Sequence, residues 1–257
     1  MIVVKVGGAE GIDIQNVIRD LAGYDQFVLV HGCSSVVNKM SEEAGHPPRM
    51  VTSVSGYTSR FTDKRTMEIF EKANESINRE IVTSFQNLGV NAVGLVGADG
   101  GLLRARRKDA IKIIEDGKKK VLRGDYTGRI ESVNVDVLNS LLDEGRLPVV
   151  APIAVSNENE AVNVDGDRVA AAIAGALHAD TLIFLSNVPG LMDLDSDRLI
   201  DRITVDDTMN YAKGRMRKKM LGAKEALESG IRRVILSDAN TERPVTDAMN
   251  GAGTVIE

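Results

Sequence analysis

The chain of 257 residues is 43% hydrophobic and 27% charged, values typical of a globular protein, and it is long enough for one large domain or two closely packed lobes. Its 32 basic and 37 acidic side chains give a net charge of -5, which excludes a global cationic field that would attract nucleic acid. The single cysteine excludes an internal disulfide, and the three histidines add no closed zinc set. No apolar run approaches the ~20 residues that span a bilayer, so we expect a cytoplasmic protein without a membrane partner.

A strand pattern interrupted by a lysine opens the sequence. Residues 1–4 are apolar, Lys5 follows, and Gly7 and Gly8 end the run. Because glycine lacks a Cβ atom, backbone N–H groups at such a turn can approach an anion. The pattern indicates a phosphate site at the carboxyl edge of a parallel sheet, and a surface lysine at an ordinary turn is an equally weighted alternative.

Helix and strand patterns then alternate along the chain. The expected segments are a helix at 11–22, a strand at 27–30, a helix at 36–44, a long helix from an N-cap at Thr62 to Leu88, a strand at 92–96, a helix at 133–144, a strand at 147–155 interrupted by prolines, a helix at 165–177, a strand at 181–185, helices at 205–212 and 216–227, and a last central strand at 234–236. This alternation predicts an α/β fold, a three-layer αβα sandwich with a mostly parallel sheet. The approximate boundary between two lobes is expected near residue 180.

Residues 103–130 interrupt the alternation. Two runs at 111–114 and 121–122 flank Asp116-Gly117, which predicts an antiparallel hairpin. The segment is rich in cations, among them Arg104, Arg106, Arg107, Lys108, Lys112, Lys118, Lys119, Lys120 and Arg123. A solvated hairpin is the favoured interpretation, and a docking surface for an acidic partner is the alternative.

Two further polar segments are not required by the hydrophobic pattern. Asp165 and Asp167 stand at the start of a helix, where they either cap it or hold a catalytic lysine or magnesium-bound water. Residues 213–219 contain five cations, which indicates bound anions or an exposed helix end. Nucleic acid is a weaker candidate ligand, because the chain has no tryptophan and its four tyrosines are scattered. The P-loop, protein-kinase and complete dinucleotide-binding signatures are absent.

Four motifs, in this order, resemble those of the amino acid kinase family. They are Val-Val-Lys-Val-Gly-Gly at 3–8, His-Gly-x-Ser at 31–34, Asn-x-Asp-Gly-Asp at 163–167 and Gly-x-Met-x-x-Lys at 214–219. Within the family the chain resembles the N-acetylglutamate kinase branch. It is more similar still to the kinases of archaea and Thermus-like bacteria that act on carrier-linked aminoadipate or glutamate, on the segments 5–11, 45–49, 59–63, 123–128, 187–191 and 214–219.

This resemblance implies the amino acid kinase fold and a homodimer, with the helix from Asp63 to Leu88 near the two-fold axis. It also implies transfer of the γ-phosphoryl group of ATP, with Mg²⁺ bridging the phosphates, to a side-chain carboxylate to give an acyl phosphate. The substrate would be aminoadipate or glutamate attached to the acidic carrier protein LysW, in lysine or arginine biosynthesis. The alternatives are a kinase of free N-acetylglutamate and a non-catalytic nucleotide-binding sensor.

The resemblance also implies residue roles. Lys5 and Lys219 would stabilise the transition state, and Asp167 would hold both lysines. Phosphate and ATP contacts would come from Gly7, Gly8, Gly32, Ser186, Asn187, Lys213 and Met216, and substrate contacts from Gly32, Cys33, Arg60 and Asn163. Residues 1–178 would bind substrate and phosphate, residues 179–257 would bind ATP, and no side chain would ligate the metal. Two departures from relatives are Cys33 in place of glycine and Asp165 in place of asparagine.

Overall fold

A single eight-stranded sheet runs through the computed structural model, which describes all 257 residues. Its strand order is β14-β16-β15-β13-β1-β2-β10-β5. The strands span β1 Ile2–Val6, β2 Phe27–His31, β5 Ala92–Val96, β10 Leu147–Ala151, β13 Thr181–Ser186, β14 Arg202–Ile203, β15 Arg233–Asp238 and β16 Thr254–Ile256. All neighbours pair in parallel except β15 and β16. The predicted mostly parallel sheet is confirmed.

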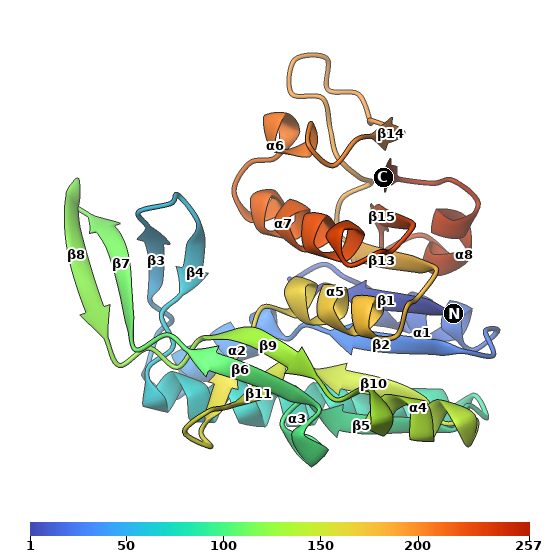
Figure 1. Cartoon of the computed structure of the whole chain (residues 1–257), viewed down its shortest axis with the longest axis horizontal. Helices are drawn as coiled ribbons and strands as arrows, with labels where there is room; N and C mark the ends of the chain where they lie inside the picture. Colours follow the sequence, from blue (N-terminus) through green and yellow to red (C-terminus); the bar gives the residue numbers. More distant parts are fainter.

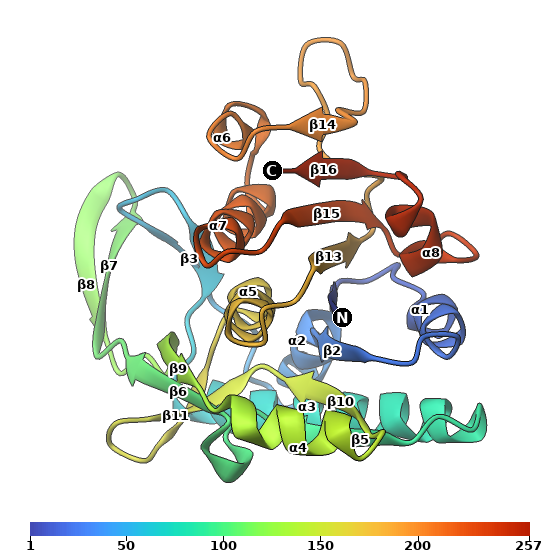
Figure 2. The same ribbon diagram turned by 45° about the vertical axis from the view of Figure 1, so that its right-hand side comes forward.

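Helices cover both faces of this sheet (Figures 1 and 2). They are α1 Ile14–Leu21, α2 Ser34–Glu43, α3 Lys64–Asn87, α4 Val135–Asp143, α5 Gly166–Ala176, α6 Thr208–Tyr211, α7 Arg215–Glu228 and α8 Pro244–Met249. Figure 2 shows α5 and α7 together on one face, with α1 and α8 on the other. The core contains fully buried residues from several strands, including Val4, Leu29, Val149, Phe184 and Ile235. The three-layer αβα architecture is therefore confirmed, and none of its helices combines the length and apolar character that a membrane crossing requires.

Two four-stranded sheets are added to this framework. The second sheet has the order β12-β11-β6-β9, from Ala161–Asn163, Ile153–Ser156, Leu103–Arg107 and Gly128–Val133. The third has the order β4-β3-β7-β8, from Thr58–Arg60, Met50–Ser53, Ala110–Glu115 and Lys118–Arg123, and it stands away from the central sheet in Figure 1. The predicted hairpin is β7-β8, whose turn residues Asp116 and Gly117 both have positive φ. The β3-β4 hairpin was not predicted, because its short strands are largely polar.

Several predicted details are wrong. The cap of α3 is Asp63 rather than Thr62, because the Asp63 carboxylate accepts a hydrogen bond of 2.8 Å from the N–H of Thr66. The helix expected at 205–212 is confined to α6, and β16 follows the strand expected to be last. The three arginines at 104, 106 and 107 belong to β6 of the second sheet and not to the hairpin.

Candidate active site

Two lysines distant in sequence meet one carboxylate where β1, α5 and α7 come together. The Nζ atom of Lys5 lies 2.8 Å from Oδ1 of Asp167, and Nζ of Lys219 lies 3.2 Å and 3.3 Å from the two carboxylate oxygens. The three residues are 8%, 9% and 9% exposed. Charges this deeply buried are costly unless they are paired, so Asp167 fixes the position of both ammonium groups.

The electrostatics of this triad favour a bound anion. Burial alone would raise the pKa of Asp167, but Lys219 and Lys5 outweigh it and hold the pKa of the carboxyl well below its usual range. Burial lowers the pKa of Lys219, an effect that Asp167 opposes and Lys5 reinforces. Because two cations face one carboxylate, an anion such as a phosphate would relieve their mutual repulsion.

The two aspartates at the start of α5 have different structural roles. Oδ1 of Asp165 accepts hydrogen bonds from the N–H groups of Asp167 and Arg168, at 3.0 Å and 3.3 Å, and so caps the helix. Asp167 lies within the first turn and contacts the lysines. The sequence left two interpretations open for these aspartates, helix capping and lysine holding. Capping applies to Asp165, and lysine holding applies to Asp167.

The turn after β1 touches the turn after β2 through glycine backbone. A Cβ atom on Gly8 would lie 2.2 Å from the nitrogen of Cys33, and one on Gly32 would lie 2.6 Å from the nitrogen of Gly8. The N–H of Gly7 donates to the Leu185 carbonyl and that of Gly32 to the Val6 carbonyl, whereas the N–H of Gly8 donates to no backbone carbonyl. Gly7 and Gly32 therefore have their N–H groups engaged within the sheet, and Gly8 keeps its N–H available for a phosphate.

Cys33 is accommodated without strain in this turn. It precedes α2 with a φ of -144°, which any residue can adopt, and its buried side chain packs with Val37, Met67 and Phe70. Burial raises the pKa of the thiol to about 12, although Arg60 opposes the shift. The thiol is therefore protonated, and it acts as an apolar packing group between α2 and α3.

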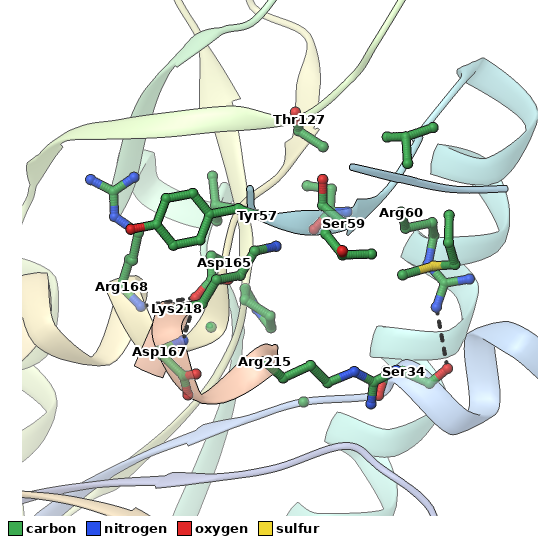
Figure 3. Close-up of a pocket in the computed structure, with 18 of the residues that line it drawn as sticks. Ser34, Tyr57, Ser59, Arg60, Thr127, Asp165, Asp167, Arg168, Arg215 and Lys218 are labelled. Atoms are coloured by element: carbon green, nitrogen blue, oxygen red, sulfur yellow. Dashed lines mark hydrogen bonds between the residues drawn. The ribbon is translucent and has the colours of Figure 1, made fainter. Parts of the chain in front are cut away.

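A cavity of about 580 Å³ opens above the triad and extends to the third sheet (Figure 3). Of the residues predicted from the sequence, its lining includes Lys5, Gly8, Gly32, Cys33, Arg60, Asn163 and Asp167. Gly7, Ser186, Asn187, Lys213, Met216 and Lys219 do not line it. The structure thus brings the predicted substrate residues and one triad lysine into one space.

Arg60 on β4 presents an unsatisfied donor beside the cavity. One terminal nitrogen, Nη2, donates to the Ser34 carbonyl at 3.4 Å, and the other, Nη1, is buried without a partner. Burial lowers the pKa of Arg60, and nearby Arg215 adds to the effect. Buried donors are normally paired, so a carboxylate bound in the cavity would satisfy this guanidinium. Asn163 is held beside the cavity by its amide, which donates to the Thr62 hydroxyl at 3.0 Å.

The sequence of this chain is similar to those of known proteins. Residues 1–237 match the amino acid kinase family. The chain belongs to that family. It is 49% identical to the [LysW]-aminoadipate kinase of Deinococcus radiodurans, over 100% of this chain and 91% of that protein, and 46% identical to the [LysW]-aminoadipate kinase of Thermus thermophilus, over the whole of both chains. The resemblance drawn from the four motifs is confirmed.

A solved structure shares the fold at low sequence identity. The N-acetylglutamate synthase from Neisseria gonorrhoeae superimposes with a TM-score of 0.81 at 21% identity, over 99% of this chain and 58% of that one. This match concerns architecture only. The expected amino acid kinase fold is confirmed by the family match over residues 1–237 and by the similar folds of isopentenyl phosphate kinase and Giardia carbamate kinase, each with a TM-score of 0.67.

Several cavity residues were not singled out from the sequence, and three of them carry polar or charged groups of interest. Arg215 and Lys218 line the cavity from α7, and Tyr57 lines it from the turn between β3 and β4. Burial lowers the pKa of Lys218, with Asp165 opposing the shift. Figure 3 shows Arg215 extending toward Ser34. Arg215, Lys218 and Lys219 share one helix face through their i, i+3, i+4 spacing, a signal that the cation run at 213–219 contained. The sequence does not say which face meets the cavity.

The four residues expected on the ATP side lie outside the cavity. Ser186 ends β13, and its hydroxyl is buried without a partner. Asn187 and Lys213 are exposed, and Met216 packs against the main core at the start of α7. Ser186 and Asn187 thus lie at the end of β13, and Lys213 and Met216 lie at the start of α7.

Proposed function

We propose that this member of the amino acid kinase family transfers the γ-phosphoryl group of ATP to the side-chain carboxylate of aminoadipate or glutamate linked to LysW. The product is an acyl phosphate, in lysine or arginine biosynthesis. The observation that carries the proposal is the triad of Lys5, Asp167 and Lys219 beside a cavity whose opposite wall holds the unpartnered Nη1 of Arg60. The names of the relatives at 49% and 46% identity support the choice of substrate.

In this proposal the triad neutralises charge on the transferring group. Phosphoryl transfer chiefly requires in-line positioning and stabilisation of the charged oxygens. Lys5 contacts the transferring phosphoryl group and Lys219 the leaving side, while Asp167 keeps both ammonium groups in place without touching the reacting atoms. Gly8 offers its N–H to the phosphates, and Gly7 and Gly32 permit the close approach of the two turns.

The acceptor would be held from the other wall of the cavity. Arg60 would bind a carboxylate of the substrate through its free Nη1, and Asn163 would bind the amide end, next to Gly32 and Cys33. Ser186, Asn187, Lys213 and Met216 would contact the nucleotide from the C-terminal lobe, residues 179–257. When bound with ATP, Mg²⁺ would neutralise charge on the phosphates, and no side chain of the chain is expected to ligate it.

A hydroxamate assay for acyl phosphate tests the function. Wild-type enzyme and Lys219→Ala are each given ATP with LysW-linked aminoadipate, LysW-linked glutamate or free N-acetylglutamate. We expect product from a LysW-linked substrate and a loss on the order of 10²-fold in the variant. Product from N-acetylglutamate alone would support the alternative kinase. No product from wild type with any substrate would refute the enzyme assignment and favour a nucleotide-binding sensor.

We also propose a cytoplasmic homodimer that associates near α3. One face of this 24-residue helix is buried against the protein, the opposite face is exposed, and Leu88 at its C-cap is an exposed large apolar residue. Sedimentation equilibrium of wild type and of Leu88→Glu measures the association. A wild-type mass equal to one chain would refute the dimer.

A further inference from the structure

Strand β8 is a free edge of the third sheet. The order β4-β3-β7-β8 leaves β8 paired with β7 alone, and every residue of β8 except Leu122 is exposed. Figure 1 shows no element beyond it. Such an edge can accept another strand through its backbone.

The register of the hairpin identifies which backbone groups are free. Asp116 and Gly117 form a two-residue turn, so Glu115 and Lys118 are a hydrogen-bonded pair and bonded pairs recur at every second position. The N–H and C=O groups of the even-numbered residues of β8 therefore face β7, and those of Lys119, Val121 and Arg123 face outward. Strand β7 has the matching pattern, because the carbonyl of Lys112 faces β3 and accepts a hydrogen bond from the N–H of Val54.

The side chains around this edge favour an acidic, partly apolar partner. Lys112, Lys118, Lys119 and Arg123 form no ion pair within the chain, whereas Lys120 lies 2.6 Å from Glu115. Val121 is 55% exposed and Ile114 is 43% exposed. Residues 119, 121 and 123 share one face of the strand, so an added strand would meet unpaired cations and an apolar side chain together.

The edge leads toward the cavity. Lys108 and Ile111, at the base of β7, line the cavity, and so does Thr127, which follows β8 by four residues. The six residues of β8 span roughly 20 Å when extended. One end of a segment paired along β8 would therefore lie near the cavity mouth.

We propose that β8 binds an extended acidic segment of a partner protein by strand addition, and that this segment directs an attached substrate into the cavity. The inference rests on the proposed function, because it gives the carrier protein a docking site. The unpaired lysines and arginine supply the charge complementarity, and Lys119, Val121 and Arg123 supply the backbone hydrogen bonds. The competing account is that lysines on an edge strand only prevent aggregation.

Val121→Pro is the sharpest test. Proline removes one outward-facing N–H, and it is tolerated where the N–H of an edge strand faces solvent. Val121→Thr is the matched control, because it keeps the N–H and the β-branched shape. We expect the KM for LysW-linked substrate to be on the order of 10-fold higher in Val121→Pro than in Val121→Thr, with KM for ATP and kcat unchanged.

Hydrogen exchange of the backbone amides gives a second test. It uses the wild-type enzyme, so it does not depend on whether a variant folds. The outward N–H groups of Lys119, Val121 and Arg123 should exchange rapidly in the free enzyme and become protected when LysW-linked substrate is added. Equal KM values in the two folded variants, or no added protection at these three amides, would overturn the inference and leave edge protection as the role of the lysines. Failure of wild type to phosphorylate the carrier-linked substrate would instead count against the proposed function.

Discussion

The triad and the β7-β8 hairpin both concentrate lysine, but in opposite environments. Lys5 and Lys219 are buried and fixed by Asp167, whereas Lys118 and Lys119 are exposed and unpaired. Burial makes the position of a charge matter, because water cannot screen it. Exposure leaves a long-range attraction that salt weakens. In the proposed function, lysine would therefore organise a reacting group in one region and attract a partner in the other.

The largest expected effect is that of Asp167→Asn. Losing the carboxylate leaves two buried ammonium groups without a counter-charge, which should lower the free energy of unfolding by about 3–5 kcal/mol. The kcat should fall on the order of 10²-fold, with a smaller change in KM for ATP, because the lysines lose their alignment. Urea unfolding and steady-state kinetics measure both quantities.

Asp165→Asn is the control for this change. Asparagine caps a helix as well as aspartate, so the free energy of unfolding should change by less than about 0.5 kcal/mol. If both variants lost stability equally, the distinction between the capping and the lysine-holding aspartate would be wrong.

Gly8→Ala should be nearly as disruptive to the buried region. The added Cβ would meet the backbone of Gly32 and Cys33 at 2.2 Å, and neither can move without displacing its turn. We expect a loss of about 3 kcal/mol in the free energy of unfolding and weaker ATP binding by calorimetry. Gly23→Ala, where the nearest atom is 3.5 Å away, should cost less than about 1 kcal/mol. Equal losses would show that the contact between the two turns is not tight.

His31 should make stability depend on pH next to the triad. Burial lowers the pKa of His31 to about 4, and the nearby charge of Lys5 adds to the shift. The unfolded chain then binds the proton more readily, with an ordinary pKa of about 6.5. The contribution of the neutral His31 side chain to the free energy of unfolding is complete above pH 6.5. Roughly 3 kcal/mol of it is lost as the pH falls toward 4.

Urea unfolding of wild type and His31→Gln between pH 7 and pH 4 measures this dependence. The difference in free energy of unfolding between the two proteins should narrow as the pH falls. Parallel curves would mean that the native imidazole takes up a proton as readily as the unfolded one.

The smallest effect on stability should come from the hairpin. Lys118→Glu with Lys119→Glu should change the free energy of unfolding by less than about 0.5 kcal/mol. The same pair should raise the KM for LysW-linked substrate on the order of 10-fold at low salt, and the increase should shrink with added salt. Arg232→Glu with Arg243→Glu, exposed cations that do not line the cavity, provides the control. An equal increase in KM in both double variants would show that the effect of the hairpin substitutions comes from the change in net charge alone.

The sequence by itself determined the layered fold and nominated most of the candidate site residues. Apolar runs at 2–4, 27–30 and 181–185 have the lengths of buried strands, and the amphipathic segments between them specify helices. Lys5, Asp167 and Lys219 stand in motifs whose order marks the amino acid kinase family, so their nomination needed no coordinates. Local residue chemistry was sufficient because each signal is contained within a few consecutive positions.

Only the tertiary structure decided which charges meet. Asp165 and Asp167 have the same side chain two positions apart, and the direction of each at the start of α5 makes one a cap and the other a partner of two lysines. The cations near residues 104–123 divide between two sheets because strand pairing is set by long-range register. The free edge of β8 likewise depends on which strand lies beside it, which residue types within the strand do not specify.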